Sequence, residues 1–251
     1  MKVFQITDTH LTKTAGEHDA NLEKLLNIVD QDPEESILLL TGDLANDAVP
    51  AAYNRLKSSI EKRANISHCF ALAGNHDDLN CMKACFKDSK IQIKQTANIN
   101  GIPFHFLDTS KKPLGTELAL GAGRVARKEM AALKKTIRKK QAVIVCHHPI
   151  LDVSNQWFKQ IGIENQNQLI HAFKTKQMII SGHAHHYFEI QQGNIQQFVG
   201  ISSSYGFEHD SSTPQRTNMA GMTIYNVEVT NSQISISFAG TQYIHGCGLQ
   251  Q

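Results

Sequence analysis

The fold is decided by residues 36–43, which read SILLLTGD. The apolar run shows no polar alternation, which is typical of a strand that is buried on both faces of a sheet. Four other apolar runs also end in polar groups of the kind that bind metals: Asp8-Thr9-His10, Gly74-Asn75-His76-Asp77, His147-His148-Pro149 and Gly182-His183-Ala184-His185. Ligands of open α/β sheets gather beyond the carboxyl ends of the strands. Five such strand ends therefore predict one shared site.

Strands and helices alternate in the front half of the chain, and hairpins dominate the back half. Apolar runs predict strands at 3–7, 36–41, 68–73, 142–146 and 177–181. Helical spacing predicts helices at 17–31, 50–63, 79–86, 127–139 and 164–174. Alternating segments predict hairpins at 91–99 with 102–108, 188–192 with 195–199, and 222–229 with 233–238. This order predicts an α/β fold, one domain over residues 1–251, with two packed mixed sheets and helices outside.

The bulk composition excludes several classes of protein. The chain has 251 residues, 41% of them apolar, and a formal net charge of +2, which gives no strong case for a nucleic-acid or membrane surface. No run approaches the roughly 18 apolar residues of a membrane span. Cleavage of a signal peptide would remove Asp8 and His10. The five cysteines are odd in number and lack zinc-ribbon spacing, so we expect a reduced cytoplasmic protein without a membrane partner.

The polar groups at the strand ends can hold two metal ions. Residues two apart in an extended chain point to the same side, which allows Asp8 and His10 to share one ion. Each motif alone is weak, because a polar strand exit is common, but five together are hard to assemble by chance. The predicted donors are Asp8, His10, Asp43, Asn75, His147, His183 and His185. Oxygen and imidazole donors without thiolates indicate iron, manganese, zinc or cobalt.

The same motifs resemble the signature of the calcineurin-like metallophosphoesterases over about residues 3–200. The resemblance implies a four-layer α/β/β/α sandwich. It further implies that Asp8, His10 and His185 hold one metal, that Asn75, His147 and His183 hold the other, and that Asp43 is shared between them. His147 is preferred to His148 because it fits the family's H-x-P pattern. His76 corresponds to the catalytic histidine beside the metals.

Within this family the chain is similar to the class III cyclic-nucleotide phosphodiesterases, in the runs QITDTHL at 5–11, TGDLAND at 41–47 and LAGNHD at 72–77. Ala73 stands where phosphoprotein phosphatases carry an arginine, and His76 stands where the UDP-diacylglucosamine hydrolases carry one. The resemblance implies hydrolysis of 3′,5′-cyclic AMP to 5′-AMP, with iron and manganese favoured. We expect a hydroxide that bridges the two metals to attack the phosphorus atom.

The side chains that contact the substrate are harder to predict. We expect Asn75 and His76 to hold the phosphate oxygens, and His76, oriented by Asp77, to stabilise charge or protonate the leaving alkoxide. Asn46 is a further candidate for substrate binding, and Asn165 and His209 are candidates by loop position only. The irregular segment 205–221 lies over the site or is ordinary surface; the sequence favours neither.

Three alternatives remain open at the level of sequence. The first is a broad phosphodiesterase for 2′,3′-cyclic nucleotides or glycerophosphodiesters, because the metal site senses only the phosphate. The second is a scaffold that has lost its metals, which the complete donor set opposes. The third is a nuclease that uses the basic stretch Lys134–Lys140, although one like-charged helix face is common without such a role. The expected partner is a small-molecule phosphodiester rather than nucleic acid.

Overall fold

The first sheet is built around the apolar strand β2 (Ser36–Thr41), whose six residues are all buried. Its neighbours β1 (Lys2–Ile6) and β3 (Ile66–Leu72) both run parallel to it. The short β4 (Ile91–Gln92) follows β3, and an antiparallel hairpin of β13 (Ala220–Thr230) and β14 (Gln233–His245) extends the sheet beyond β1. The computed structural model describes residues 1–34, 36–115, 117–210 and 214–245.

The second sheet also mixes parallel and antiparallel pairs. Its centre is β7 (Val143–Cys146), which runs parallel to both β6 (Ile102–Leu107) and β8 (Gln177–Ser181). The hairpin partner β5 (Thr96–Ile99) closes one side. The hairpin of β9 (Phe188–Gln192) and β10 (Ile195–Val199) closes the other, with β10 next to β8.

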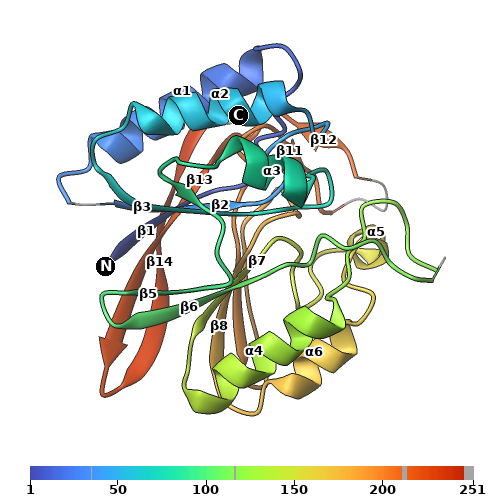
Figure 1. Ribbon diagram of the computed structural model, residues 1–251. Coiled ribbons are helices and arrows are strands. Elements are labelled where there is room, and N and C mark those ends of the chain that lie inside the picture. The colour runs from blue at the N-terminus through green and yellow to red at the C-terminus, as the bar shows by residue number, and fades with distance from the viewer. Residues whose placement is uncertain (35, 116, 211–213, 246–251) are drawn as a thin grey trace.

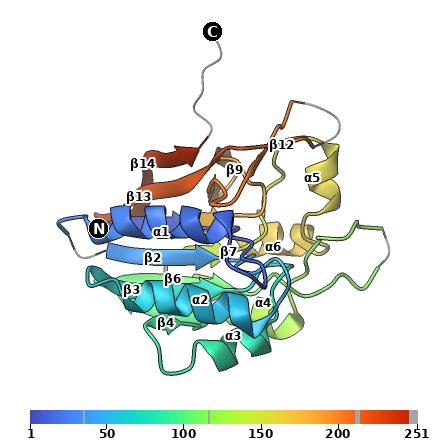
Figure 2. The ribbon, with the colours of Figure 1, turned by 90° about the horizontal axis from the view of Figure 1, so that it is seen from above.

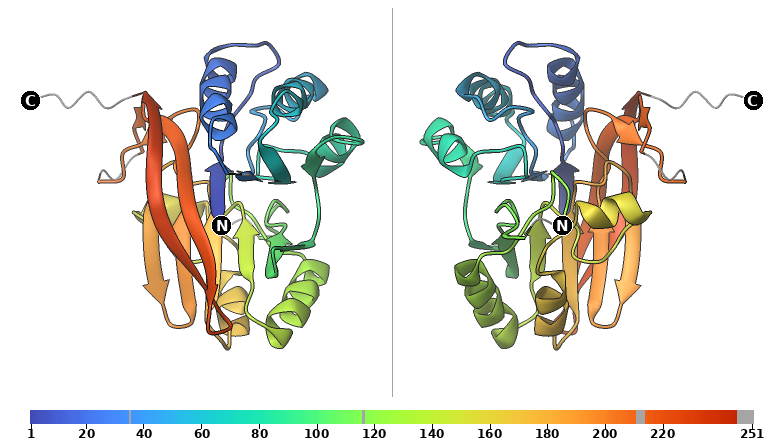
Figure 3. Two further views of the ribbon diagram at one scale, coloured as in Figure 1. Left: turned by 90° about the vertical axis from the view of Figure 1, so that its left-hand side faces the viewer. Right: turned by 90° about the vertical axis from the view of Figure 1, so that its right-hand side faces the viewer.

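The two sheets pack face to face and share one apolar core. Ile37 and Leu39 of β2 face the second sheet, where they join Phe106 and Val145 among others. The alternate residues of β2 face the opposite way, toward the helices α1 (Glu17–Asp30), α2 (Pro50–Glu61) and α3 (Leu79–Cys85). On the far side, α4 (Arg127–Lys139) and α6 (Gln166–Ala172) cover the second sheet. Figure 1 and the two side views in Figure 3 show the resulting order of helices, sheet, sheet and helices. The expected four-layer α/β/β/α sandwich is thus confirmed.

Four local features differ from the expectation. The segment 91–99 is not one strand, because the chain leaves the first sheet after β4 and enters the second at β5. Strand β14 continues to His245 rather than ending at Phe238. A short helix α5 (Gln156–Gln160) and a small hairpin of β11 (Gly206–Phe207) with β12 (Arg216–Thr217) were not expected. In the described part of the chain, none of the helices combines the length and the apolar character of a membrane span.

The carboxyl ends of β1, β2, β3, β7 and β8 meet along one edge of the sandwich. Gln5, near the carboxyl end of β1, is buried and joins the two sheets. Its amide nitrogen donates to Thr41 at 2.8 Å and to the Ser181 carbonyl at 2.7 Å, while Tyr225 donates to its oxygen. The helices α1 and α2 lie along β2, and the loops after the strands converge at one end of these elements (Figure 2). The fold therefore brings the five polar motifs together.

Candidate metal centre

The first group of predicted ligands comes from the loops after β1 and β8. The Nε2 atom of His185 lies 3.2 Å from Asp8 Oδ1 and 3.3 Å from His10 Nε2. All three side chains are buried. Asp8 Oδ1 has no hydrogen-bond partner in the described part of the chain, whereas its Oδ2 accepts hydrogen bonds from Thr7 Oγ1 and from the backbone of His183. One oxygen of Asp8 is therefore fixed by the protein, and the other is aimed at the imidazoles.

The second group comes from the loops after β3, β7 and β8. The Nε2 atom of His147 lies 3.2 Å from Asn75 Oδ1 and 3.2 Å from His183 Nδ1. Asp43 lies between the groups, because its Oδ2 is 3.4 Å from His147 Nε2 and 3.9 Å from His10 Nε2. The seven predicted ligands thus form two adjacent clusters joined by one carboxylate.

Hydrogen bonds to backbone carbonyls orient three of the histidines. The atom Nδ1 of His147 bonds to the Thr41 carbonyl at 2.8 Å, Nε2 of His183 to Ile161 at 3.0 Å and Nδ1 of His185 to Tyr205 at 2.7 Å. A carbonyl partner fixes the proton on that nitrogen and leaves the other one to bind a metal. In each case the other nitrogen is the one that faces the cluster.

Burial and neighbouring charges set the ionisation of the group. Burial lowers the pKa of His10 and of His183 to about 3, so both rings are neutral near pH 7. Burial alone would lower the pKa of His147 too, but the Asp43 carboxylate raises it to about 9. Burial opposes ionisation of Asp8, yet His185 and His147 hold the pKa of its carboxyl well below the usual value. Near neutral pH the site therefore offers neutral imidazole rings, at His10 and His183, and a charged carboxylate, at Asp8.

The ring nitrogens of His148 are both used in hydrogen bonds within the protein. Its Nδ1 is 2.8 Å from Thr109 Oγ1, and its Nε2 is 3.0 Å from the carbonyl oxygen of Gly121. Both ring nitrogens are therefore engaged by the protein, although His148 lies close enough to His147 and His183 to belong to a possible metal-binding trio. We favour His147 as the ligand because its Nε2 faces Asp43 and Asn75.

The backbone at the site is strained. Five of the seven predicted ligands have a positive φ, which non-glycine residues seldom adopt: Asp8 (54°), His10 (43°), Asp43 (49°), His183 (70°) and His185 (54°). The loops also approach each other closely. A Cβ atom added to Gly74 would overlap the Asp43 carboxylate, and one added to Gly182 would overlap Thr7. Strain of this kind clusters at functional sites, because the surrounding structure holds the chain in place.

His76 lies at the exposed side of the centre. Its backbone N–H donates to Asp43 Oδ1 at 2.8 Å, and its ring meets the His10 ring edge-on, with centroids 4.9 Å apart. The carbonyl of Asn46 lies 2.9 Å from His76 Nδ1. The expected ring partner, Asp77, is used elsewhere. Its carboxylate accepts hydrogen bonds from the backbone of Leu44, Ala45 and Gly74 and from the Tyr53 hydroxyl.

The hydrogen bonds of Asp77 differ from the expected contact with the His76 ring. Its carboxylate fastens the loop after β3 to the loop after β2, because its donors come from both loops and from α2. The His76 ring instead forms its hydrogen bond with the backbone carbonyl of Asn46. Asn46 therefore contacts the site with its backbone carbonyl, whereas its side chain donates a hydrogen bond to Asp47.

The two candidates chosen by loop position do not face the two clusters. Both side-chain ends of Asn165 bond to the backbone of Val125, at 3.0 and 2.9 Å, so it fastens the start of α6. Among the described residues, His209 forms no hydrogen bond with a predicted metal ligand. Its Nε2 bonds to the Ala184 carbonyl, and its ring stacks on Phe158.

Tyr205 and Arg216 also lie at the site, although no motif in the sequence singles them out. The ring of Tyr205 lies 4.6 Å from that of His185 and 5.4 Å from that of His10. Arg216 lies over the Tyr205 ring, with its guanidinium carbon 3.4 Å from the centroid. The described parts of segment 205–221 therefore reach the site at these residues; 211–213 lie outside the described chain. Only the position of this segment between two hairpins hinted at such a role.

The residues present fit a pair of metal ions. Buried donor atoms converge, Asp8 Oδ1 has no hydrogen-bond partner among the described residues, and Asp43 is placed between the two clusters. Trios of ligand atoms within 4.8 Å of one another include Asp8 with His10 and His185, and Asp8 with Asp43 and His147. Mixed oxygen and nitrogen donors suit borderline and hard metals.

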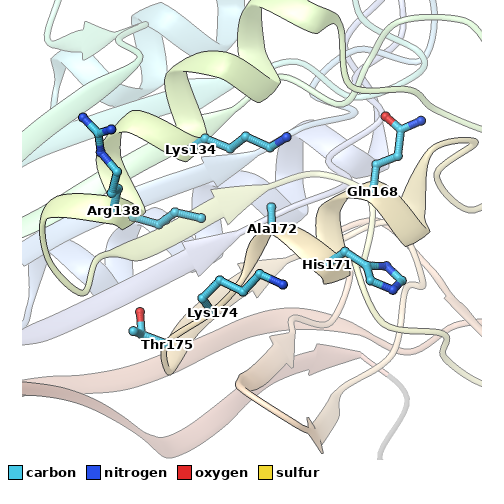
Figure 4. A pocket seen from close by; sticks show the side chains of 8 residues that line it. Lys134, Arg138, Gln168, His171, Ala172, Lys174 and Thr175 are labelled. Carbon is cyan, nitrogen blue, oxygen red and sulfur yellow. The ribbon is translucent and has the colours of Figure 1, made fainter.

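A separate hollow lies between α4 and α6, and none of the predicted ligands lines it. Its volume is about 670 Å³, and Figure 4 shows Lys134, Arg138 and Lys174 around it. Its lining residues in the described chain are contributed by α4, α6 and the segment after α6, and they lie apart from the two clusters of predicted ligands. The basic stretch on α4 therefore gives the nuclease alternative little support.

The comparison with protein families identifies the class. The model of the calcineurin-like phosphoesterases matches residues 1–187, which contain all seven predicted ligands. The chain belongs to the calcineurin-like phosphoesterase family.

Several curated relatives are bacterial phosphodiesterases. The chain is 23% identical over 224 residues to a 3′,5′-cyclic-nucleotide phosphodiesterase of Nostoc sp., covering 85% of this chain and 82% of that protein. It is 27% identical to a probable cyclic nucleotide phosphodiesterase of Colwellia psychrerythraea, over 72% and 70% of the two chains. It is 24% identical to the 3′,5′-cyclic adenosine monophosphate phosphodiesterase CpdA of Vibrio vulnificus, over 84% and 79%.

Solved structures share the fold at low identity. The Plasmodium protein GAP50 superposes with a TM-score of 0.59 at 14% identity, covering 98% of this chain and 87% of that one. A putative 5′-nucleotidase of Staphylococcus aureus superposes with a TM-score of 0.54 at 11% identity, covering 96% and 53%. These likenesses support the architecture alone.

Proposed function

We propose that this phosphoesterase hydrolyses 3′,5′-cyclic AMP to 5′-AMP at a centre of two metal ions. The observation that carries the proposal is the position of Asp43, whose Oδ2 faces His10 in one cluster and His147 in the other. The names of the relatives support the substrate, because three of them denote cyclic-nucleotide phosphodiesterases that cover most of the chain.

Asp8, His10 and His185 would hold one ion, Asn75, His147 and His183 the other, and Asp43 both. When bound, the metals would act as Lewis acids and would lower the pKa of water enough for hydroxide, the nucleophile, to be available near pH 7. Iron and manganese are the favoured pair, as the resemblance implies. The hydrogen bonds of His147, His183 and His185 to carbonyls hold the ring planes in place for this role.

The protein side chains would orient the substrate and move one proton. The Asn75 amide, in the second cluster, and the His76 ring, at the exposed side of the centre, would contact the phosphate oxygens. The Asn46 carbonyl forms a hydrogen bond with Nδ1 of His76. The other ring nitrogen of His76, Nε2, is therefore the atom that would donate a proton to the leaving oxygen. A sugar oxygen is a poor leaving group, so this proton contributes strongly to the rate. We further propose a cytoplasmic location, from the cysteine pattern, and a small-molecule phosphodiester as the partner.

A substrate panel tests the proposal. Protein reconstituted with Mn²⁺ or with iron is assayed on 3′,5′-cyclic AMP, 2′,3′-cyclic AMP and glycerophosphoethanolamine, with and without chelator. We expect the highest kcat/KM on 3′,5′-cyclic AMP and loss of all turnover with chelator. Asp43→Asn should abolish turnover. Its matched control is Asp88→Asn, an exposed aspartate whose φ of 53° is close to the 49° of Asp43.

The second candidate is a phosphodiesterase of broad specificity. The two clusters favour it to the same degree, because their donors would contact only the phosphate. Equal kcat/KM on all three diesters would replace the cyclic AMP assignment with this one, and no turnover of any diester in metal-loaded protein would contradict both.

A further inference from the structure

Arg216 lies at the edge of the candidate centre and has no carboxylate partner among the residues that the structure describes. Its side chain is exposed, and the ion pairs of the described arginines involve Arg55, Arg63 and Arg124 instead. The guanidinium carbon lies 3.4 Å from the centroid of the Tyr205 ring, well inside the range of a cation–π contact. Tyr205 therefore holds this cation in place of a carboxylate.

Both members of this stack are attached to the predicted metal ligands. The Tyr205 carbonyl bonds to His185 Nδ1 at 2.7 Å, and its ring stacks on that of His10. Strand β12 places Arg216 directly opposite Phe207 of β11, and the Phe207 ring lies 5.0 Å from that of His185. The guanidinium is thus held at a fixed place beside the site rather than on a free surface loop.

The two clusters and His76 account for the phosphate of a nucleotide, and they leave its base without a partner. A guanidinium is planar, delocalised and weakly hydrated, so it stacks well on flat rings. With Tyr205 packed against it, the exposed Arg216 offers such a surface next to the site. We propose that Arg216, supported by Tyr205, binds the nucleobase of the substrate by stacking. This inference rests on the proposed function, because it names the contact that distinguishes a nucleotide from other diesters.

Equilibrium binding of the product and of its base-free analogue tests the inference. The affinities of 5′-AMP and of ribose 5-phosphate are measured by calorimetry on Mn²⁺-loaded wild type, Arg216→Ala and Arg216→Lys. We expect wild type to favour 5′-AMP, and both variants to lose about tenfold in 5′-AMP affinity, as for loss of one base-stacking contact. Ribose 5-phosphate should bind all three within about twofold. Arg138→Ala, an arginine in the groove between α4 and α6, should match wild type for both ligands.

The lysine variant separates stacking from charge. If Arg216→Lys binds 5′-AMP as tightly as wild type, the positive charge suffices and the stacking role is overturned. It is also overturned if both ligands weaken equally, because Arg216 then binds the phosphate. Tyr205→Leu should weaken 5′-AMP binding in wild type but add little in Arg216→Ala, since the two residues act as one unit. Additive losses would contradict the support by Tyr205.

Turnover in the wild type keeps this inference distinct from the proposed function. If wild type cleaves cyclic AMP and the variants bind 5′-AMP normally, only the inference on Arg216 fails. If wild type does not cleave cyclic AMP but the variants lose 5′-AMP affinity, the proposed reaction fails and the nucleotide site stands. Far-UV circular dichroism should be unchanged in each Arg216 variant, because the side chain is exposed.

Discussion

At the scale of single residues, the backbone of the candidate centre is strained at the predicted ligands, because several of them have a positive φ. His10, with a φ of 43°, is buried and contributes Nε2 to the first cluster. A left-handed conformation costs an L-residue about 1–2 kcal/mol, and glycine avoids that cost. Removing the imidazole should therefore be less harmful through glycine than through alanine.

We expect His10→Gly to be more stable than His10→Ala by about 1 kcal/mol in the absence of metal, after the entropy of glycine in the unfolded chain is subtracted. Urea unfolding of both variants measures the difference. Thr9 serves as the control, because it is buried beside His10 but has no positive φ. There alanine should be the more stable replacement. The same order at both positions would mean that strain at His10 is negligible.

His76 offers a test of proton transfer at the same scale. It is exposed and, in the proposed assignment, holds neither metal, so His76→Ala should retain both ions. We expect turnover of cyclic AMP to fall by about 10²–10⁴-fold. A diester with a nitrophenol leaving group should lose far less, because that group departs without a proton. Parallel assays of both substrates, with metal content measured, decide the question; equal losses would exclude the proton-donor role.

At the scale of elements, a buried histidine couples β6 to α4. His105 is fully buried, its Nδ1 lies 3.0 Å from the Thr136 hydroxyl, and its Nε2 has no partner in the described residues. Burial lowers the pKa of His105 to about 4, below the usual value of about 6.5. Above pH 6.5 the ring is neutral in both states. Between pH 6.5 and 4 the unfolded chain binds the proton and the folded protein does not, so stability falls as the pH falls.

We therefore expect the free energy of unfolding to decrease between pH 7 and pH 4.5, with a contribution from His105 on the order of 2 kcal/mol. His105→Asn keeps a polar atom near Thr136 and cannot be protonated, so it should remove that part of the decrease. Urea titrations of both proteins at the two pH values measure it. An identical pH dependence would show that His105 does not titrate as a buried neutral ring.

The elements also show what local sequence could not determine. Residues 91–99 alternate like one strand, yet they serve two sheets, because the chain crosses between layers around residues 93–95. The crossing is fixed by distant contacts, such as the bond from Phe106 to the Gln95 carbonyl. Strand β14 continues past Gly240, whose φ of 151° accompanies an irregularity in its pairing with β13.

At the scale of the whole molecule, the strongest predictions came from strand ends. Apolar runs such as that of β2 identify strands buried on both faces, and parallel strands carry their carboxyl ends to one edge, so the meeting of Asp43 with His147 could be anticipated. Tyr205 and Arg216 could not, because their place depends on a hairpin that packs against His185. The hydrogen bonds of Asp77 could not be anticipated either, because several of its donors lie on the loop after β2 and on α2. From the core that both sheets share, we propose that the chain is one folding unit.

The central claim is that Asp43 joins two metal sites in one phosphodiesterase. Its most direct test is the number of metal ions bound per chain, measured by elemental analysis after reconstitution and gel filtration, for wild type and Asp43→Asn. We expect two equivalents in wild type and fewer in the variant, with Asp88→Asn unchanged. One equivalent or none in wild type that cleaves cyclic AMP would contradict the account.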